Sequence, residues 1–401
     1  MKIRLQFSPP EASSQAKVLF PNTKVNDNGA FSVRILQKGY SMGLSCGLVG
    51  LPSSGKTVIY NAITAAGVSN YNGAKMNKSV VYVPDHRLDG LTEIYRPQKV
   101  VPATLEVVDI SGLKPDPQGN GHGLRLLGYI KDVEALLHVV RCFEDGSIPF
   151  EYETIDPIRD IETVELELMV ADSNTLEHKI KRLAKKVRAG DKETIRDTVN
   201  CEKVYTAIQQ GTPARKQNLS VQELASIREC NLASLKPVLY IANIKSIEDA
   251  DNRHVRALEQ IASDEGAEAI FVCGKDEADI SQLSLDERQE FLQELGLKES
   301  SMERLLSAAY RMLGLINFFT TGEDEVRAWT CRKEDKAPVA AGKIHTDMEK
   351  GFIRMEVIRY EDLVELGSEA AISKAGRQHL EGRDYEVQNG DIVAVRFSLG
   401  E

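Results

Sequence analysis

The sequence predicts an α/β protein with a mostly parallel sheet, an inserted helical arm and a smaller C-terminal α+β module. Three observations support this. Apolar runs rich in Val, Ile and Leu alternate with helical stretches, which is typical of a parallel sheet covered on both faces. A highly charged helical stretch from 156 to 234 interrupts that alternation. After Gly314 the runs become short and strand-like, as in a separate small module.

Bulk properties exclude several classes of protein. A chain of 401 residues predicts two or three domains, and 42% apolar with 27% charged residues is ordinary for a globular protein. The net charge of −10 argues against wholesale coating of nucleic acid, so an RNA contact needs a local basic patch. The six cysteines are scattered, which excludes a CxxC metal site and favours a reducing compartment. No run approaches the roughly 18 apolar residues of a membrane helix. We expect a cytoplasmic monomer that does not bind membranes.

Residues 1–41 differ in character from the rest of the chain. They are polar and loop-rich, with six Lys or Arg and two acidic residues, and they show no sustained period. We expect a flexible extension. An organellar transit peptide is the less favoured alternative, because the stretch has no Arg-rich amphipathic helix.

The remaining elements follow in order. The apolar strands are "LSCGLVG", "ATLEVVDISG", "ALLHVVRCF", "KPVLYIAN" and "EAIFVCG", and "TVIYNAITAAG" is a helix. They predict a nucleotide-binding domain formed by 42–155 and 235–313. In 156–234, apolar residues at three- and four-residue steps and the turn "RAGDKE" predict an antiparallel helical hairpin. In 314–401 we expect four strands and one helix near Asp362–Ala375.

The stretch "GLVGLPSSGKTV" from Gly47 to Val58 carries the strongest signal of function. Gly50 to Thr57 fits G-x-x-x-x-G-K-[ST] at every defined position, after an apolar strand and before a helix. In this motif glycines let backbone N–H groups converge on phosphate oxygens, at the positive end of the helix. Lys56 then reaches the β- and γ-phosphates, and the Thr57 hydroxyl ligates Mg²⁺.

Two further motifs lie at the ends of predicted strands. Asp109 begins a D-x-x-G that ends at Gly112, where the carboxylate holds Mg²⁺ and the glycine N–H meets the γ-phosphate. Asn243 ends "VLYIAN", where it either bonds the base or ties the base loop to the phosphate loop. Open α/β sheets bind ligands at this edge. The predicted nucleotide contacts are Gly50, Ser53, Ser54, Gly55, Lys56, Thr57, Val58, Gly112, Asn243 and Ile244, and the predicted Mg²⁺ ligands are Thr57 and Asp109.

These motifs resemble the YchF or Obg-like ATPases, a branch of the P-loop GTPase-fold proteins. The resemblance covers residues 42–399 and rests on "MGLSCGLVGLPSSGKT", "VPDHRLDGL", "VDISGL", "HVVRCFED", "LKPVLYIAN", "FFTTGEDEVRAWT" and "AAGKIHTDMEKGFIRMEVI". It implies a GTPase-like domain, a coiled-coil arm, a C-terminal TGS domain of β-grasp type, Mg²⁺ and ATP as ligands, and association with ribosomes. Family members typically start at the position of Met42.

The chain departs from the family pattern at positions that bear on hydrolysis. Gly73 stands where the family has a Thr that meets Mg²⁺ and the γ-phosphate, and Phe150 stands where it tends to carry a His. "PDPQGNGHG" replaces a lysine-containing second switch. Leu113, which the family shares, cannot orient water as the Gln of Ras-like enzymes does. His122 is the candidate catalytic residue, although a lone loop histidine is more often solvated.

Base preference follows from the residues after Asn243. Guanine selectivity in this fold comes from an acidic residue three positions later, and here that position is Ser246. Ser246 cannot accept both guanine N–H groups, so ATP is expected over GTP, with dual specificity as the alternative.

Other features suggest partners. Seven basic residues within the hairpin form a candidate contact with ribosome or RNA, the alternative being a solvated helix face: Lys179, Lys181, Arg182, Lys185, Lys186, Arg188 and Lys192. His345, Thr346 and Asp347 are expected in a turn with a structural or partner-binding role, and Trp329 in a core or interface. Two functions remain open: a slow ATPase that associates with ribosome or RNA, and a hydrolysis-deficient nucleotide-binding switch or scaffold that signals by occupancy.

Overall fold

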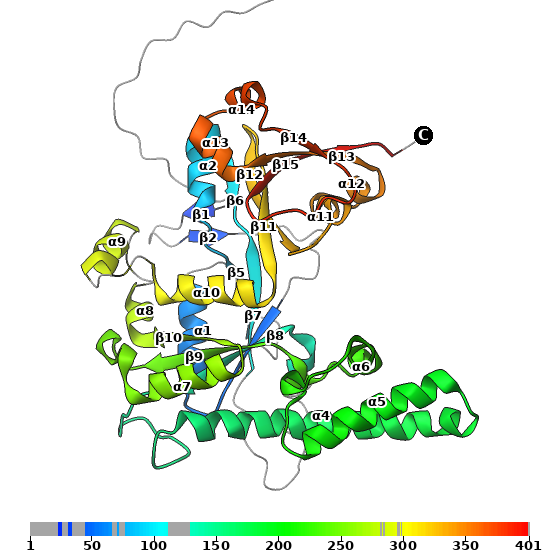
Figure 1. The fold of residues 1–401 in the computed structure, drawn as a ribbon. Helices are drawn as coiled ribbons and strands as arrows, with labels where there is room; N and C mark the ends of the chain where they lie inside the picture. Colours follow the sequence, from blue (N-terminus) through cyan, green and yellow to red (C-terminus); the bar gives the residue numbers. More distant parts are fainter. Residues whose placement is uncertain are drawn as a thin grey trace, which may run out of the picture.

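The computed structural model describes residues 23–25, 31–33, 45–65, 70–71, 77–110, 129–280, 283, 285–294, 297 and 299–399. Figure 1 shows a central sheet with a second sheet above it and a long helical arm below and to the side. In the part of the chain described, no helix is long and apolar enough to cross a membrane. Within residues 1–41 the structure describes one antiparallel strand pair, β1 (Thr23–Val25) and β2 (Phe31–Val33).

The central sheet contains the predicted parallel strands. Its order is β10 (Glu268–Cys273), β9 (Val238–Ile244), β8 (Ala135–Arg141), β3 (Ser45–Val49), β7 (Thr104–Asp109), β5 (Asn77–Tyr82) and β4 (Asn70–Tyr71). The first five strands run parallel, β5 pairs antiparallel with β7, and β4 pairs antiparallel with β5. The buried strands are almost continuously apolar because both faces of the sheet are covered.

Different helices cover the two faces of this sheet. The face shared with the second sheet is covered by α1 (Lys56–Ala65) and α10 (Ser301–Met312). The opposite face is covered by α7 (Arg253–Asp264) and the first half of α4 (Pro157–Arg188). Two shorter helices, α8 (Gly274–Ile280) and α9 (Leu285–Glu294), lie between β10 and α10 in the chain.

The arm contains α4, α5 (Lys192–Gln209) and α6 (Val221–Ile227). Asp156 caps α4 by accepting hydrogen bonds from the backbone of Ile158 and Arg159, and Asp191 caps α5. The predicted hairpin is therefore present, but the apolar stripe of α4 has two partners. Its first half packs on the central sheet and its second half on α5, so one straight helix carries the arm away from the sheet (Figure 1).

The C-terminal module is built on a six-stranded sheet. Its order is β14 (His379–Glu381), β13 (Phe352–Arg359), β15 (Asp391–Phe397), β11 (Leu315–Thr320), β12 (Glu325–Arg332) and β6 (Lys99–Val101). The module has more helices than the one expected: α11 (Ala337–Ile344), α12 (Thr346–Lys350), α13 (Tyr360–Leu366) and α14 (Glu369–Ala375). The expected helix near Asp362–Ala375 is two helices, because Gly367 adopts a φ of 73° and Ser368 caps the second one.

A segment from the first half of the chain belongs to this second sheet. Between β5 and β7 the chain leaves the central sheet, forms α2 (Arg87–Tyr95), and adds β6 parallel to β12. Asp85 anchors this excursion: its carboxylate accepts hydrogen bonds from Arg87 at 2.8 and 2.7 Å and from Asn317 Nδ2 at 2.9 Å. The two strands β5 and β7 are thus connected to each other through the C-terminal sheet.

Candidate functional site

The loop from Gly50 to Thr57 joins β3 to α1 and has the backbone of a phosphate cradle. Gly50 and Gly55 adopt positive φ angles of 148° and 102°. A Cβ on Gly50 would lie 2.3 Å from the carbonyl oxygen of Val139, and one on Gly55 would lie 2.1 Å from Asn243 Nδ2. Only glycine fits at these two positions.

Ser53 and Ser54 occupy the middle of the loop in different ways. Ser53 is exposed and has a φ of 59°, in the left-handed region that side chains other than Gly, Asn and Asp rarely adopt. Ser54 is 2% exposed, and its Oγ has no hydrogen-bond partner among the described residues. A buried hydroxyl without a partner is costly, so this oxygen is available to a ligand in the cradle.

Lys56 lies folded over the loop. Its Nζ donates hydrogen bonds to the carbonyl oxygens of Gly50 at 3.0 Å and Leu51 at 2.6 Å. Burial lowers the pKa of Lys56 from 10.5 to about 8, and the nearby carboxylate of Asp109 opposes that shift. Thr57 and Val58 follow in the first turn of α1, and both are exposed.

Asp109 and Asn243 lie at the same edge of the sheet as this loop. Leu48 of β3 pairs with Asp109, the last residue of β7, so the strand that carries this carboxylate ends next to the strand that leads into the phosphate loop. Asn243 Nδ2 donates to the carbonyl oxygen of Ser54 at 2.9 Å. Of the two roles considered for Asn243, this contact is the tie to the phosphate loop. Ile244, which follows it, is buried.

The donor set fits a nucleotide phosphate chain with Mg²⁺. A buried lysine, two positions where only glycine fits, an unpaired serine hydroxyl and an exposed threonine hydroxyl surround one loop, with a carboxylate on the adjacent strand. Hydroxyl and carboxylate oxygens are the ligands that Mg²⁺ prefers. No group of three or more His, Cys, Asp or Glu side chains in the described ranges forms a separate metal site.

Several predicted residues lie outside the described residues. They are Gly73, Gly112, Leu113 and His122. The predictions made for them, including the γ-phosphate contact of Gly112 and the catalytic candidacy of His122, therefore stay predictions.

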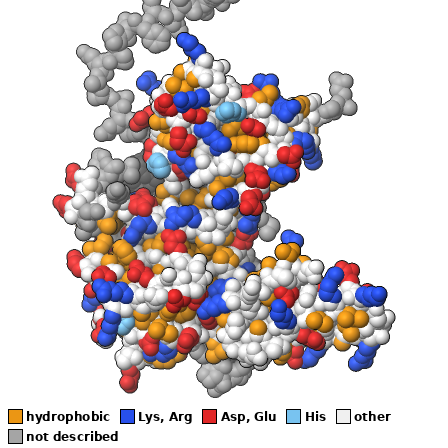
Figure 2. Space-filling view, in the orientation of Figure 1, with side chains coloured by type: hydrophobic (Ala, Val, Ile, Leu, Met, Phe, Trp, Pro, Cys, Tyr) orange, Lys and Arg blue, Asp and Glu red, His pale blue; other side chains and the backbone are white. Residues whose placement is uncertain are grey.

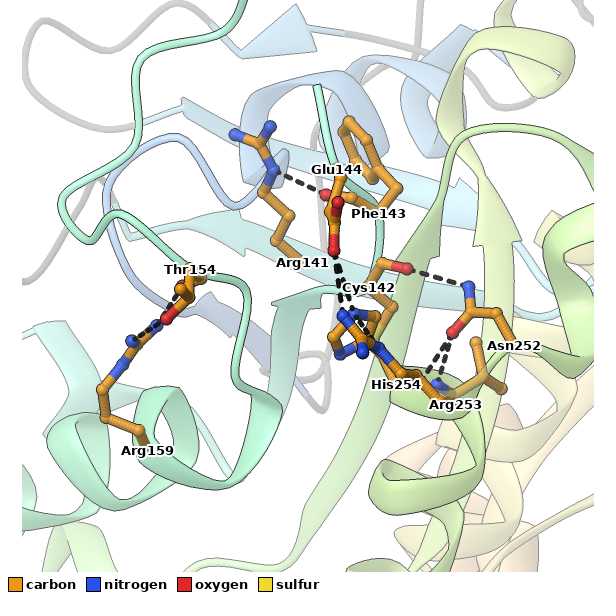
Figure 3. Close-up of polar contacts among 10 residues, drawn as sticks. Arg141, Cys142, Phe143, Glu144, Thr154, Arg159, Asn252, Arg253 and His254 are labelled. Atoms are coloured by element: carbon orange, nitrogen blue, oxygen red, sulfur yellow. Dashed lines mark hydrogen bonds and ion pairs between the residues drawn. The ribbon is translucent and has the colours of Figure 1, made fainter. Parts of the chain in front are cut away.

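Phe150 is described, and its surroundings are those of a packing residue. The Arg141 guanidinium lies 5.1 Å from the Phe150 ring centroid, and the Tyr152 ring meets it edge-on at 6.3 Å. A functional candidate that the sequence did not reveal lies next to Phe150. It is Arg141, the last residue of β8, and its side chain is buried (Figure 3). The sequence feature that could have identified Arg141 is a charged residue at the end of an apolar strand, in "HVVRCFED".

His138 on β8 was also missed. It is fully buried, its ring lies 5.6 Å from that of Tyr240, and its Nε2 has no hydrogen-bond partner within the described residues. Burial lowers the pKa of His138 to about 3, assisted by the positive charges of Arg215 and Lys56. The imidazole is therefore neutral at physiological pH.

The structure reduces the predicted basic surface of the arm. Lys179 is buried and bonded to the carbonyl oxygen of Ser226, so it is a structural residue and not part of a surface. Lys181 pairs with Glu177 at 2.6 Å, and Arg182 pairs with Glu229 at 2.7 Å. Of the seven predicted cations, those that are exposed and form no ion pair within the described part of the arm are Lys185, Lys186, Arg188 and Lys192. Figure 2 shows blue side chains at this tip, at the lower right.

The remaining predicted residues have structural contacts. His345 lies between α11 and α12, where Nδ1 accepts a hydrogen bond from the Asp347 backbone N–H at 3.2 Å and caps α12. Trp329 is half-buried, with its Nε1 bonded to Thr320 Oγ1 at 2.9 Å and the Arg327 guanidinium 4.1 Å from its ring. These contacts account for both residues without a catalytic role.

Comparison with known proteins gives consistent results. Residues 315–398 match a family model for the C-terminal part of YchF GTPases, described as a protein of unknown function. The chain is 42% identical over 366 residues to the Ribosome-binding ATPase YchF of Bacillus subtilis, covering 89% of this chain and 100% of that protein. It is 42% identical over 363 residues to the protein of that name from Escherichia coli O157:H7, with the same coverage.

A solved structure extends the similarity to the fold. The Schizosaccharomyces pombe YchF GTPase matches with a TM-score of 0.78 and 33% identity, covering 90% of this chain and 100% of that one. The predicted P-loop α/β fold is confirmed by this match and by the strand order described above. From the phosphate loop, the strand order and the near full-length identity to these relatives, the chain belongs to the YchF family.

Proposed function

We propose that this protein is a nucleotide-binding regulatory ATPase that associates with ribosome or RNA, prefers ATP over GTP and hydrolyses it slowly to ADP and phosphate. The observation that carries the proposal is the Gly50–Thr57 loop, with buried Lys56 inside it and Asp109 at the end of the adjacent strand. The names of the relatives, Ribosome-binding ATPase YchF, support the activity and the partner.

Each residue of the loop has a role in this proposal. Backbone N–H groups around Gly50 and Gly55 bind phosphate oxygens, and Lys56 exchanges its contacts to the loop carbonyls for phosphate oxygens. Thr57 and Asp109 hold Mg²⁺, directly or through water. The bound ion supplies neutralisation of charge on the phosphates. Gly112 and Val58 complete the contacts, with Ile244 beside Asn243.

Preference for ATP follows from the absence of a carboxylate for guanine. Ser246 stands at the position of the guanine-binding acid, and its Oγ lies 3.5 Å from Asp249 Oδ2. A hydroxyl cannot accept both guanine N–H donors, so the usual discrimination against adenine is lost.

Slow hydrolysis follows from the side chains that are missing. Gly73 has no hydroxyl for Mg²⁺, Leu113 cannot position water, and Phe150 packs against Arg141 and has no polar group. Positioned water and charge compensation supply most of the rate in related enzymes, so turnover is expected far below the roughly 1–10³ s⁻¹ of typical enzymes. The alternative is a switch or scaffold that binds nucleotide without useful hydrolysis, and the same three positions favour it.

The test combines binding with single-turnover hydrolysis of ATP, with and without ribosomes. Lys56→Ala is expected to abolish or strongly weaken ATP binding, because the charge-assisted contacts are lost. A slow hydrolysis that Lys56→Ala removes supports the ATPase, and binding with no turnover under either condition supports the occupancy switch. Unchanged affinity of Lys56→Ala for ATP contradicts the proposal as a whole.

The proposed ribosome contact is tested separately on the arm. Charge reversal of Lys185, Lys186 and Arg188 is expected to reduce co-sedimentation with ribosomes and flatten its salt dependence. Reversal of Arg253 and Arg256, exposed on α7, is the control. Equal losses for the two sets indicate a nonspecific charge effect, and no loss for the arm set contradicts the assignment.

A further inference from the structure

Arg141 is a buried guanidinium that contacts carbonyl groups of a single loop. It is 1% exposed, at the end of β8. Nε donates to the carbonyl oxygen of Phe143 at 3.1 Å, Nη2 to that of Asp145 at 3.0 Å and Nη1 to that of Ile148 at 3.4 Å. It also lies 4.6 Å from the ring centroid of Phe143. Among the described residues it forms no ion pair, so its hydrogen bonds to these carbonyl groups offset the cost of burying the charge, and they hold loop 143–150 in place.

That loop holds the segment that follows Asn243. Asp145 Oδ2 lies 3.1 Å from Lys245 Nζ, and its Oδ1 accepts hydrogen bonds from the Ser147 backbone N–H and Oγ. Lys245 lies two residues after Asn243, in the segment 244–251, which contains Ser246, the position on which the proposed base preference depends. A chain of contacts therefore leads from Arg141 through Asp145 to the base segment.

The backbone of one residue, Cys142, contacts both ends of the same segment. The Cys142 N–H donates to the carbonyl oxygen of Asn243 at 2.9 Å, and its carbonyl oxygen accepts from Asn252 Nδ2 at 2.9 Å. Asn252 in turn caps α7 by accepting the backbone N–H groups of His254 and Val255. Figure 3 shows Cys142 beside Asn252, with the Arg141 side chain pointing away from Asn252 toward Phe143. The end of β8 thus sets the position of the whole 244–251 segment.

We propose that Arg141 is a positioning residue for the nucleotide base. By fixing loop 143–150 it supports segment 244–251, whereas the phosphate loop is held by β3, α1 and the Asn243 amide, and the hydrogen bonds of the Arg141 guanidinium all go to loop 143–150. A binding group is effective only when its supporting residues hold it within a fraction of an ångström. Removing Arg141 weakens recognition of the base and leaves recognition of the phosphates intact. The inference rests on the proposed function, since it requires a nucleotide at the phosphate loop.

The test compares ATP with inorganic tripolyphosphate, which presents phosphates without a base. Arg141→Met is expected to weaken ATP binding about fivefold or more, which is the loss of about 1 kcal/mol, and to change tripolyphosphate affinity less than twofold. Thermal unfolding of each variant is measured alongside. Arg159→Met is the control. Its guanidinium pairs with Asp160 at 2.7 Å, lies 3.8 Å from the Tyr152 ring and donates to the Thr154 carbonyl oxygen at 2.9 Å, and none of these contacts is to the base segment.

Each outcome decides the question. A selective loss of ATP affinity in Arg141→Met, absent in Arg159→Met, supports the inference. If Arg141→Met weakens the binding of ATP and tripolyphosphate equally, or leaves both unchanged, the inference is overturned while the proposed function stands. If Arg141→Met does not fold, Asp145→Ala is used instead. It removes the ion pair with Lys245 and leaves the buried Arg141 in place, and its affinities for ATP and tripolyphosphate are compared in the same way. A wild-type chain that binds no nucleotide overturns the proposed function and this inference with it.

Discussion

Asn243 and Ser54, 189 positions apart in the chain, are joined by a buried hydrogen bond of 2.9 Å from the side-chain amide to the backbone carbonyl. Gly55 allows this approach, since a Cβ there would lie 2.1 Å from the amide nitrogen. The end of β9 is thereby fixed to the phosphate loop at the end of β3.

Asn243→Ala is expected to weaken the binding of ATP and of GTP by similar factors. The substitution leaves the Ser54 carbonyl without its donor, which costs about 1–3 kcal/mol in the free energy of unfolding, and it loosens the phosphate loop that both nucleotides would contact. Because the contact is to the phosphate loop, the ratio of the two affinities changes little. Calorimetric titration with each nucleotide checks this. A change in the ATP to GTP ratio larger than the common loss would assign Asn243 to the base instead.

Nucleotide affinity is expected to fall as pH rises above about 8. Burial lowers the pKa of Lys56 to about 8 in the free protein, so the side chain loses its proton above that pH. Polyphosphate favours the charged form, so binding above pH 8 takes up a proton and becomes weaker. Titrations from pH 7 to 9.5 in buffers of different ionisation enthalpy measure both effects. Affinity that stays constant over this range, with no proton uptake, would contradict the role of Lys56.

Ser53→Asn is expected to stabilise the free protein. Ser53 has a φ of 59°, and asparagine adopts this left-handed conformation at lower cost than serine. The expected gain in free energy of unfolding is about 1 kcal/mol or less. Ser53→Ala is the control, because alanine gains nothing in this region, and denaturant unfolding compares the two. Equal stability of the Asn and Ala variants would show that the backbone at this position stores no strain.

Asp85→Ala is expected to destabilise the junction between the two sheets by about 3 kcal/mol, because Arg87 and Asn317 lose a buried partner. Burial alone raises the pKa of Asp85, but hydrogen bonds from Arg87 and Asn317 outweigh it and hold the pKa below its usual 3.8. A depressed carboxylate contributes stability above the unfolded pKa, and that contribution is lost as pH falls below about 4.

Thermal unfolding between pH 3 and 7 measures this contribution. Asp384→Ala, which removes an exposed partner of Lys336, is the matched control and should behave like wild type. If Asp85→Ala unfolds as wild type does at pH 7, the carboxylate does not hold the junction.

The sequence predicted the phosphate loop and the location of Asp109 and Asn243 because each follows a continuous apolar run. Parallel strands bring their carboxyl ends to one edge, so local patterns were sufficient there. β6 was not predicted, because a three-residue strand has no period, and its partner β12 lies more than 220 positions away.

Side-chain partners could not be predicted from composition. In the sequence Lys179 is one of seven basic residues predicted on the surface of the arm, but in the structure it is buried and bonded to the carbonyl oxygen of Ser226 in α6. The spacing of apolar residues in α4 predicted a helix but not the two surfaces on which it packs. Helical spacing shows which face of a helix is apolar, but not what covers that face. The partners of Arg141 could not be predicted either, because they are carbonyl groups that only the folded loop presents.

The most direct test of the account is an equilibrium titration of the wild-type protein with ATP–Mg²⁺ and with GTP–Mg²⁺ under identical conditions. With Ser246 in place of a guanine-binding carboxylate, ATP is predicted to bind at least as tightly as GTP, and Ser246→Asp is predicted to shift the ratio toward GTP. A clear preference of the wild-type protein for GTP, or no binding of either nucleotide, would contradict the account.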